Sequence, residues 1–252
     1  MRATLLGCGT STGVPVIGCT CAVCGSDDPR NRRLRTGLKL EVDGRVVLVD
    51  TPTDLRQQAL RFGLPRVDAV LFTHAHADHT LGLDELRVFN FRQSSAIPCY
   101  GSPATLADIR RHFAYAFEPG EEGGGKPRLD LIAVDGSFEA AGLETTAVPV
   151  RHGSLEVFGY RWGDLAYVTD CSFMPEPSFR LLRGVRWLVL GALRHRPHST
   201  HFSIAEAIAA ARRIGAERTV FTHMGHEVDF ASASEELPKG IELGYDGLVL
   251  DT

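Results

Sequence analysis

The sequence predicts a mixed α/β fold, and three observations lead to this expectation. Short apolar runs typical of buried strands alternate with segments of helical pattern along the whole chain. Several of these runs end directly in a loop that carries His or Asp, so strand ends present the polar side chains. The strands and helices fall into two halves that each end with a helix, and no linker-like stretch separates them. We therefore expect a single domain over residues 1–252.

Each predicted element rests on a local pattern. Apolar runs predict strands at residues 4–7, 38–42, 45–49, 67–72, 97–100, 129–134, 143–150, 157–162, 165–168, 187–190, 217–221, 240–243 and 247–250. Helical patterns predict helices at residues 55–62, 80–86, 102–113, 175–182, 203–213 and 229–236. Asp43-Gly44 predicts a hairpin, and the segment 50–54 is expected to cap the first helix. Residues 118–127, rich in Gly and Glu, are read as an idle surface loop or as a mobile lid.

Composition and charge restrict the class of protein. Hydrophobic residues make up 44% and charged residues 23%, as in an ordinary globular protein. A net charge of -4 gives no general attraction to nucleic acid or to an anionic membrane. No apolar run reaches the length of about 18 residues that a membrane span needs, and the start of the chain resembles a first strand rather than a signal peptide. We expect a cytoplasmic protein with no membrane partner and no strong nucleic-acid signal.

The densest group of candidate metal ligands is Thr73-His74-Ala75-His76-Ala77-Asp78-His79, which directly follows the apolar run at 67–72. A strand end fixes the backbone, and the following loop can turn several side chains onto one point. Imidazole and carboxylate together suit Zn²⁺, Mn²⁺ or Fe. A lone His is more often structural or exposed, but four ligands within six residues favour a metal site.

Three further candidate ligands repeat this arrangement: His152, Asp170 and His223 each follow an apolar β-like run. With them, the motif His74-x-His76-x-Asp78-His79 resembles the signature of the metallo-β-lactamase superfamily of binuclear metallohydrolases. Almost the whole chain follows the order of elements in that superfamily. The resemblance implies a four-layer αββα sandwich, with two metals at one edge of the paired sheets.

The resemblance also implies which residues hold the two divalent metals, Zn²⁺ or Mn²⁺. By the family pattern His74, His76 and His152 hold the first metal. Asp78, His79 and His223 hold the second, and Asp170 bridges the two. Such a pair of ions can bind one hydroxide between them. Asp78 is therefore expected to be essential for catalysis.

A second cluster, Cys19, Cys21 and Cys24, can place three thiolates around one Zn²⁺. A structural site needs a fourth ligand, and His226 is the candidate; the other reading is three reduced cysteines without a metal. This pattern resembles the PhnP-like branch of the superfamily, the phosphoribosyl 1,2-cyclic phosphate phosphodiesterases. In that branch a C-x-C-x-x-C loop and a His in a T-H-x-x-H segment hold a structural zinc, and Thr222-His223-Met224-Gly225-His226 matches that segment.

Other residues near the motifs have weaker signals. The superfamily often has an Asp that supports the metal ligands where Asp50 stands, although the branch usually has Gly-Pro in place of Thr51-Pro52-Thr53. The branch also has a His, proposed as an acid, where His201 stands; otherwise His201 is an exposed loop residue. His195 and His198 in the same loop match no motif.

The resemblance implies a metal-dependent hydrolase. A phosphodiesterase that opens small cyclic phosphates with a metal-bridging hydroxide is favoured, because of the Cys cluster and the T-H-x-x-H segment. The alternatives are a nucleic-acid phosphodiesterase or exonuclease, and a hydrolase of thioesters or lactones such as glyoxalase II or a β-lactamase. A further alternative is a cofactor-biosynthesis protein related to that of pyrroloquinoline quinone. The expected partner is a small phosphodiester, and a homodimer would suit this branch.

Overall fold

The computed structural model describes residues 1–118 and 125–252; most of the predicted loop at 118–127 lies outside the described residues. The helices are α1 Leu55–Arg61, α2 Ala77–Thr80, α3 Leu86–Gln93, α4 Pro103–His112, α5 Ala114–Phe117, α6 Glu176–Leu182, α7 Ile204–Ile214 and α8 Phe230–Glu236. Short 3₁₀ helices lie at Pro29–Asn31 and Leu83–Glu85.

The strands form two seven-stranded sheets. The first has the order β14-β1-β2-β3-β4-β5-β6, with β1 Arg2–Gly7, β2 Gly37–Val42, β3 Arg45–Val49, β4 Ala69–Leu71, β5 Ile97–Gly101, β6 Leu129–Ala133 and β14 Val249–Asp251. The second has the order β13-β12-β11-β10-β9-β8-β7, with β7 Ser137–Ala140, β8 Leu143–His152, β9 Leu155–Trp162, β10 Leu165–Val168, β11 Trp187–Gly191, β12 Arg218–Thr222 and β13 Ile241–Leu243.

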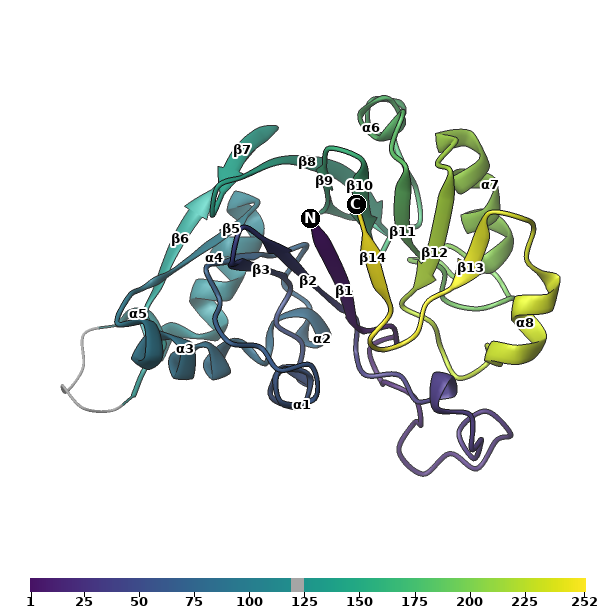
Figure 1. Cartoon of the computed structure of the whole chain (residues 1–252), viewed down its shortest axis with the longest axis horizontal. Helices are drawn as coiled ribbons and strands as arrows, with labels where there is room; N and C mark the ends of the chain where they lie inside the picture. Colours follow the sequence, from purple (N-terminus) through teal and green to yellow (C-terminus); the bar gives the residue numbers. More distant parts are fainter. Residues whose placement is uncertain (119–124) are drawn as a thin grey trace.

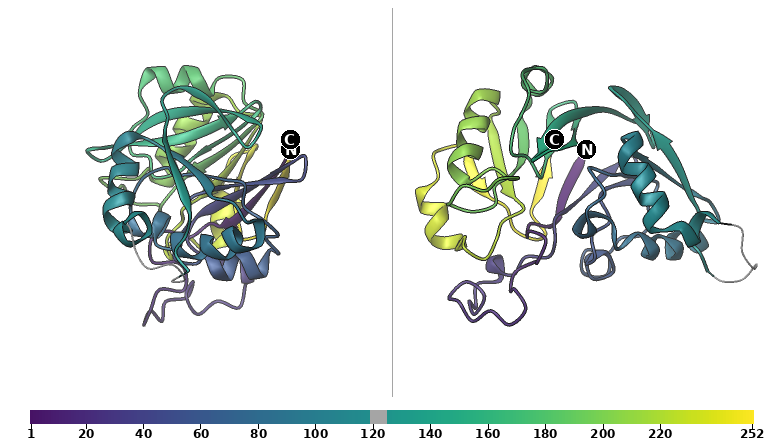
Figure 2. Two further views of the ribbon diagram at one scale, coloured as in Figure 1. Left: turned by 90° about the vertical axis from the view of Figure 1, so that its left-hand side faces the viewer. Right: turned by 180° about the vertical axis from the view of Figure 1, so that it is seen from behind.

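The two sheets pack face to face, and helices cover their outer sides (Figure 1). Buried side chains of β1 to β4 and of β8 to β12 form one continuous core between the sheets. A second core lies between the outer face of the first sheet and helices α1, α3 and α4. Helices α6 and α7 lie on the outer side of the second sheet (Figures 1 and 2). The predicted four-layer αββα sandwich of the metallo-β-lactamase fold is confirmed.

Parallel pairing brings the strand ends that matter to one edge. In the first sheet β3, β4 and β5 run parallel, and in the second β10, β11 and β12 do. The segments that follow these strands therefore meet at the same edge, where α2 lies in Figure 1. The long irregular segment between β1 and β2 carries Cys19, Cys21 and Cys24. It also projects from this edge (Figure 1).

Predicted helix starts agree with the local hydrogen bonds. The Ser203 hydroxyl accepts from the Glu206 backbone N–H, and the Glu206 carboxylate accepts from the Ser203 backbone N–H. Helix α7 therefore begins with the predicted capping box. Ser102 caps α4 with one such bond, because its hydroxyl accepts from the Thr105 backbone N–H. Each cap stabilises its helix by about 1 kcal/mol. These signals are reliable because both partners lie within one turn of each other.

Two local expectations were wrong, and one strand was missed. Asp54 makes no side-chain cap for α1; its carboxylate instead accepts from the Arg35 backbone N–H and guanidinium. The predicted helix at 80–86 is in fact α2, a 3₁₀ turn and the start of α3. Strand β7 was not expected, and its exposed, polar pattern explains why.

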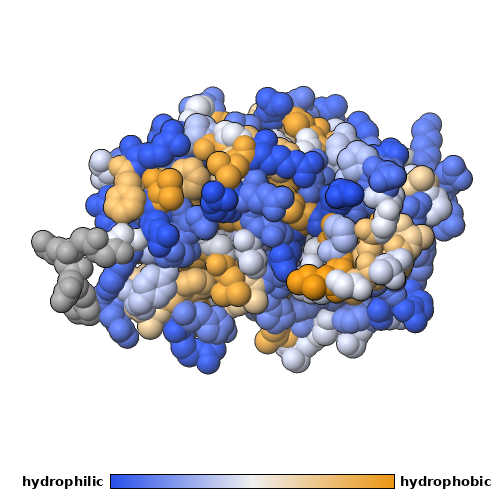
Figure 3. All heavy atoms as spheres, turned by 90° about the horizontal axis from the view of Figure 1, so that it is seen from below, coloured by the Kyte–Doolittle hydropathy of each residue, from blue (hydrophilic) through white to orange (hydrophobic). Residues whose placement is uncertain are grey.

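The surface carries no broad apolar band on the face seen in Figure 3, which is mainly hydrophilic with apolar residues in small separate groups. Over the described residues, no helix is long and apolar enough to cross a membrane. All six cysteines lie within the described part of the chain, and none of them forms a disulfide.

Candidate metal centre

The candidate ligands lie where strands of both sheets end. His74 and His76 follow β4, Asp78 and His79 lie in α2, and His152 is the last residue of β8. Asp170 follows β10 and His223 follows β12. Asp170 and His223 have φ angles of 48° and 59°, a left-handed backbone that non-glycine residues rarely adopt. Such strain, of about 1–3 kcal/mol per residue, is typical of functional sites.

The seven predicted ligands converge into two groups. One group contains His74, His76 and His152, and the other contains Asp78, His79, Asp170 and His223; within each group the ligand atoms lie within 4.8 Å of one another. Apart from Asp170, which the family pattern places between the two metals, these are the sets that the pattern implies.

Asp170 lies between the two groups and turns one oxygen toward each. Its Oδ2 is 3.8 Å from His74 Nε2 and 3.9 Å from His152 Nε2. Its Oδ1 is 3.4 Å from His79 Nε2 and 3.2 Å from His223 Nε2. Burial alone would raise the pKa of Asp170, but His223 and His79 hold it well below its usual range, so the carboxylate is ionised. One ionised carboxylate can therefore serve both groups.

Neighbouring polar groups orient the imidazoles. Asp50 accepts from His79 Nδ1 at 2.7 Å and from the backbone N–H and hydroxyl of Thr73, both at 2.8 Å. The Thr200 carbonyl accepts from His152 Nδ1 at 2.7 Å. When Nδ1 is occupied in this way, Nε2 faces the centre with its lone pair available. Asp50 thus lies where a supporting carboxylate was expected.

The donor set fits a bound divalent metal. His79 Nε2 and both ring nitrogens of His223 are buried, yet none has a hydrogen-bond partner within the described parts of the chain. Buried polar atoms of this kind are rare in proteins unless something else satisfies them. Imidazole nitrogen and carboxylate oxygen are the donors that Zn²⁺ and Mn²⁺ accept.

His201, predicted as an acid, lies against this centre rather than in open solvent. Its side chain is 14% exposed, and its Nδ1 is 3.8 Å from Asp170 Oδ2. Its ring centroid is 4.6 Å from that of His152 and 4.8 Å from that of His223. Burial, helped by these histidines, lowers the pKa of His201 to about 3. The imidazole is therefore neutral in the free protein near pH 7.

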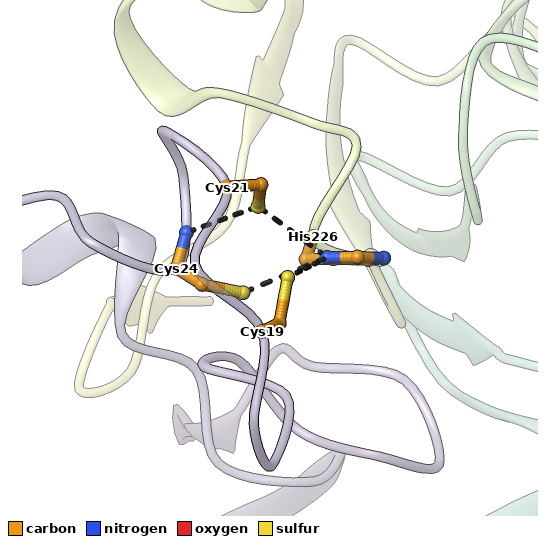
Figure 4. A group of neighbouring side chains, drawn as sticks. All are labelled: Cys19, Cys21, Cys24 and His226. Atoms are coloured by element: carbon orange, nitrogen blue, oxygen red, sulfur yellow. Dashed lines mark hydrogen bonds between the residues drawn. The ribbon is translucent and has the colours of Figure 1, made fainter.

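The cysteine cluster forms a separate candidate site (Figure 4). His226 Nδ1 lies 3.3 Å from the Sγ of Cys19 and 3.5 Å from those of Cys21 and Cys24. Ligand atoms on a tetrahedron around Zn²⁺ lie about 3.5–3.8 Å apart, given bonds of about 2.1–2.3 Å. The Cys24 backbone N–H donates to Cys21 Sγ and is the main reason that the Cys21 pKa falls to about 6. These four residues fit one tetrahedral Zn²⁺.

Sequence reasoning missed the residues that support both clusters. Thr200 holds His152 from 48 residues away. Arg33, almost fully buried, donates from Nη1 to the Gly225 carbonyl at 3.1 Å and from Nη2 to the Val228 carbonyl at 2.7 Å, on either side of His226. Neither contact has a local signal, because each depends on the packing of distant segments.

Comparisons with known proteins agree with this geometry. A family model described as a beta-lactamase superfamily domain matches residues 45–224. An octanoyltransferase of Porphyromonas gingivalis is 39% identical over 253 residues, covering 98% of this chain and 51% of that protein. A ribonuclease Z of Bradyrhizobium diazoefficiens is 31% identical over 140 residues, covering 52% of this chain and 45% of that protein. The chain thus spans about half the length of these two curated relatives.

Similarity to a solved structure extends over both full lengths. The crystal structure of a diphosphatase from the PhnP family superposes with a TM-score of 0.93 and 41% sequence identity. The superposition covers 100% of this chain and 97% of that one. It therefore includes both candidate metal sites.

Proposed function

This chain belongs to the β-lactamase superfamily and resembles its PhnP-like branch, and from this premise we propose that it is a metal-dependent phosphodiesterase that hydrolyses small phosphate diesters. The observation that carries the proposal is the convergence of six other His and Asp side chains around Asp170. We assign one divalent metal to His74, His76 and His152, and another to Asp78, His79 and His223. Asp170 would bind both. We assign the cysteine cluster with His226 to a structural Zn²⁺.

The side chains around the candidate metal centre would contribute to catalysis together with the metals. Bound Zn²⁺ or Mn²⁺ would supply Lewis acidity toward phosphoryl oxygens and lower the pKa of water toward about 7. Asp50 and the Thr200 carbonyl fix the rings of His79 and His152, so those ligands need not reorganise during turnover. The ionised Asp170 places negative charge between the two cation sites.

His201 is our candidate for the general acid that protonates the leaving group. Water attacks phosphorus, one P–O bond breaks, and the departing alkoxide takes a proton to become an alcohol. In the free protein His201 is neutral. An anionic phosphate beside the ring favours its charged form, so substrate binding raises its pKa toward the range of a general acid.

The substrate we propose is small. A cavity of about 190 Å³ lies beside His74 and His76, between α4 and the start of β9. It has room for a compact group such as a sugar ring. The similarity to a diphosphatase favours a second candidate, a disubstituted diphosphate. Hydrolysis of either substrate attacks a phosphorus with one ionisable oxygen, so the same residues suffice.

The test is phosphorus NMR of the Zn²⁺- or Mn²⁺-loaded protein with a ribose 1,2-cyclic phosphate and, separately, with a disubstituted diphosphate. Bis(p-nitrophenyl) phosphate serves as an unspecific diester probe, and the Asp78→Ala variant is the matched control. We expect the wild type to hydrolyse the diester probe and one of the two small substrates, and Asp78→Ala to do neither. Absence of all P–O cleavage by metal-loaded wild type would refute the proposal and direct attention to thioesters and lactones.

The role of His201 is tested by His201→Ala in the same assay. We expect a loss of about 10²–10⁴-fold in kcat, the usual contribution of a general acid, with both active-site metals retained. The loss should be smaller for a substrate with a p-nitrophenolate leaving group, which leaves without a proton. An equal loss for all leaving groups would show that His201 does not protonate the leaving group.

A further inference from the structure

We infer that His198 is a positioning residue for the first metal site, acting on His152 through the Thr200 carbonyl. The inference rests on the metal sites of the proposed function but not on the substrate. It gives a role to a loop histidine that matches no motif. Three contacts connect His198 to the centre.

The first contact sets the tautomer of His152. Its Nδ1 donates to the Thr200 carbonyl at 2.7 Å, and its Nε2 faces Asp170 Oδ2 at 3.9 Å. His152 is nearly buried. Loss of the Thr200 acceptor would let the ring rotate or place its proton on Nε2, and either change would remove a ligand lone pair from the centre.

The second contact holds Thr200 itself. His198 Nδ1 accepts from the Thr200 backbone N–H at 3.3 Å and lies 3.2 Å from its hydroxyl. The Thr200 methyl group also packs closely on Gly153, because a Cβ added there would lie 2.9 Å from Thr200 Cγ2. Thr200 is therefore fixed from two sides, by His198 and by the turn that follows His152.

The third contact links this arrangement to His201. His201 follows Thr200 directly, and the next residue, Phe202, donates its backbone N–H to the Cys171 carbonyl at 2.6 Å. The ring centroids of His198 and His201 are 5.3 Å apart. A loop held at Thr200 and at Phe202 places both the support of His152 and the imidazole of His201. His198 thus acts on the metal ligand and on the candidate acid together.

The experiment compares three variants. His198→Ala removes the acceptor, and His198→Asn restores one, since Asn Oδ1 occupies nearly the position of His Nδ1. His195→Ala is the matched control, because His195 is an exposed histidine of the same loop. The readouts are Zn²⁺ affinity by competition with a chelator, and the tautomer of His152 from ¹H–¹⁵N NMR of the metal-free protein. Circular dichroism checks that each variant folds.

We expect His198→Ala to weaken the first metal by about 10-fold, the low end for residues that support a ligand, and to mix the His152 tautomers. His198→Asn and His195→Ala should match the wild type in both readouts. Unchanged affinity and tautomer in His198→Ala would overturn the inference and leave the proposed function intact. A wild type that binds no metal at the His/Asp groups would instead overturn the proposed metal centre.

Discussion

The two candidate metal sites are built from different kinds of scaffold. The His/Asp ligands come from the ends of strands in both sheets and from α2, and five of the seven are fully or almost fully buried. Three of the four ligands of the cysteine site come from one irregular loop, and Cys21 is exposed. The comparison indicates that the sheets preform the first site, whereas a few distant contacts hold the second.

Arg33 explains how the second site is held to the body of the protein. Its guanidinium bonds the carbonyls of Gly225 and Val228 around His226. The Met224 backbone N–H donates to the Cys8 carbonyl at 2.8 Å, and the Thr10 N–H donates to the Met224 carbonyl at 3.1 Å. The segment from His223 to His226 thus carries one ligand of each site.

The largest expected effect is that of Asp170→Ala. One substitution removes the carboxylate that faces both histidine groups, so we expect loss of both active-site metals and of all hydrolysis. The fall in metal affinity should exceed the roughly 100-fold seen when only an outer-shell partner is lost. Isothermal titration with Zn²⁺ measures it. Retention of both metals would show that Asp170 is not shared between them.

Cys21→Ser should affect only the peripheral site. We expect loss of the structural Zn²⁺ with both active-site metals retained, because the sheets hold those ligands independently. Metal analysis after dialysis gives the stoichiometry, and Cys99→Ala is a control that alters a cysteine outside both sites. Loss of the active-site metals as well would contradict the independence of the two scaffolds.

Arg33→Met should destabilise the junction between the sites. The buried carbonyls of Gly225 and Val228 would lose their donors, which predicts a fall of about 2–4 kcal/mol in the free energy of unfolding. Urea denaturation measures this value, with the exposed Arg32→Met as the matched control. We also expect chelator to unfold the cysteine loop more readily in Arg33→Met. Equal stability of the two variants would show that Arg33 does not stabilise the segment around His226.

The stability of the protein should depend on pH through Asp246, a buried carboxylate that lies in neither site. Burial raises the pKa of Asp246 to about 7, although the N–H groups of Leu34 and Cys8 donate to it. In the unfolded chain its pKa is about 3.9. Between these values the folded state holds a proton that the unfolded state lacks, so the free energy of unfolding falls as pH rises through this window and levels off above about pH 7.

The measurement compares wild type with Asp246→Asn, which cannot titrate, by urea denaturation at pH 5 and pH 8. We expect the stability of the wild type relative to the variant to fall by about 2–3 kcal/mol over this interval. The difference between the proteins cancels the other titrating groups. A constant difference across the interval would contradict a raised pKa for Asp246.

Local patterns predicted much of this protein. The apolar run followed by His or Asp located the strand ends, and Ser203 with Glu206 located the start of α7, because each signal lies within a few residues. Helix α3 escaped prediction because its exposed Val88 and Phe91 obscure the apolar face. The pairing of β14 with β1, and the supports from Thr200 and Arg33, join residues far apart in sequence. Only packing of the whole chain determines such contacts.

Native mass spectrometry of the zinc-loaded protein counts the metals that each candidate site binds. We predict three bound metals in the wild type, two in Cys21→Ser and one in Asp170→Ala. This pattern would assign a metal pair to the sheet edge and a single ion to the loop. A wild type with one metal, or a Cys21→Ser variant that loses all three, would contradict the existence of two separate sites.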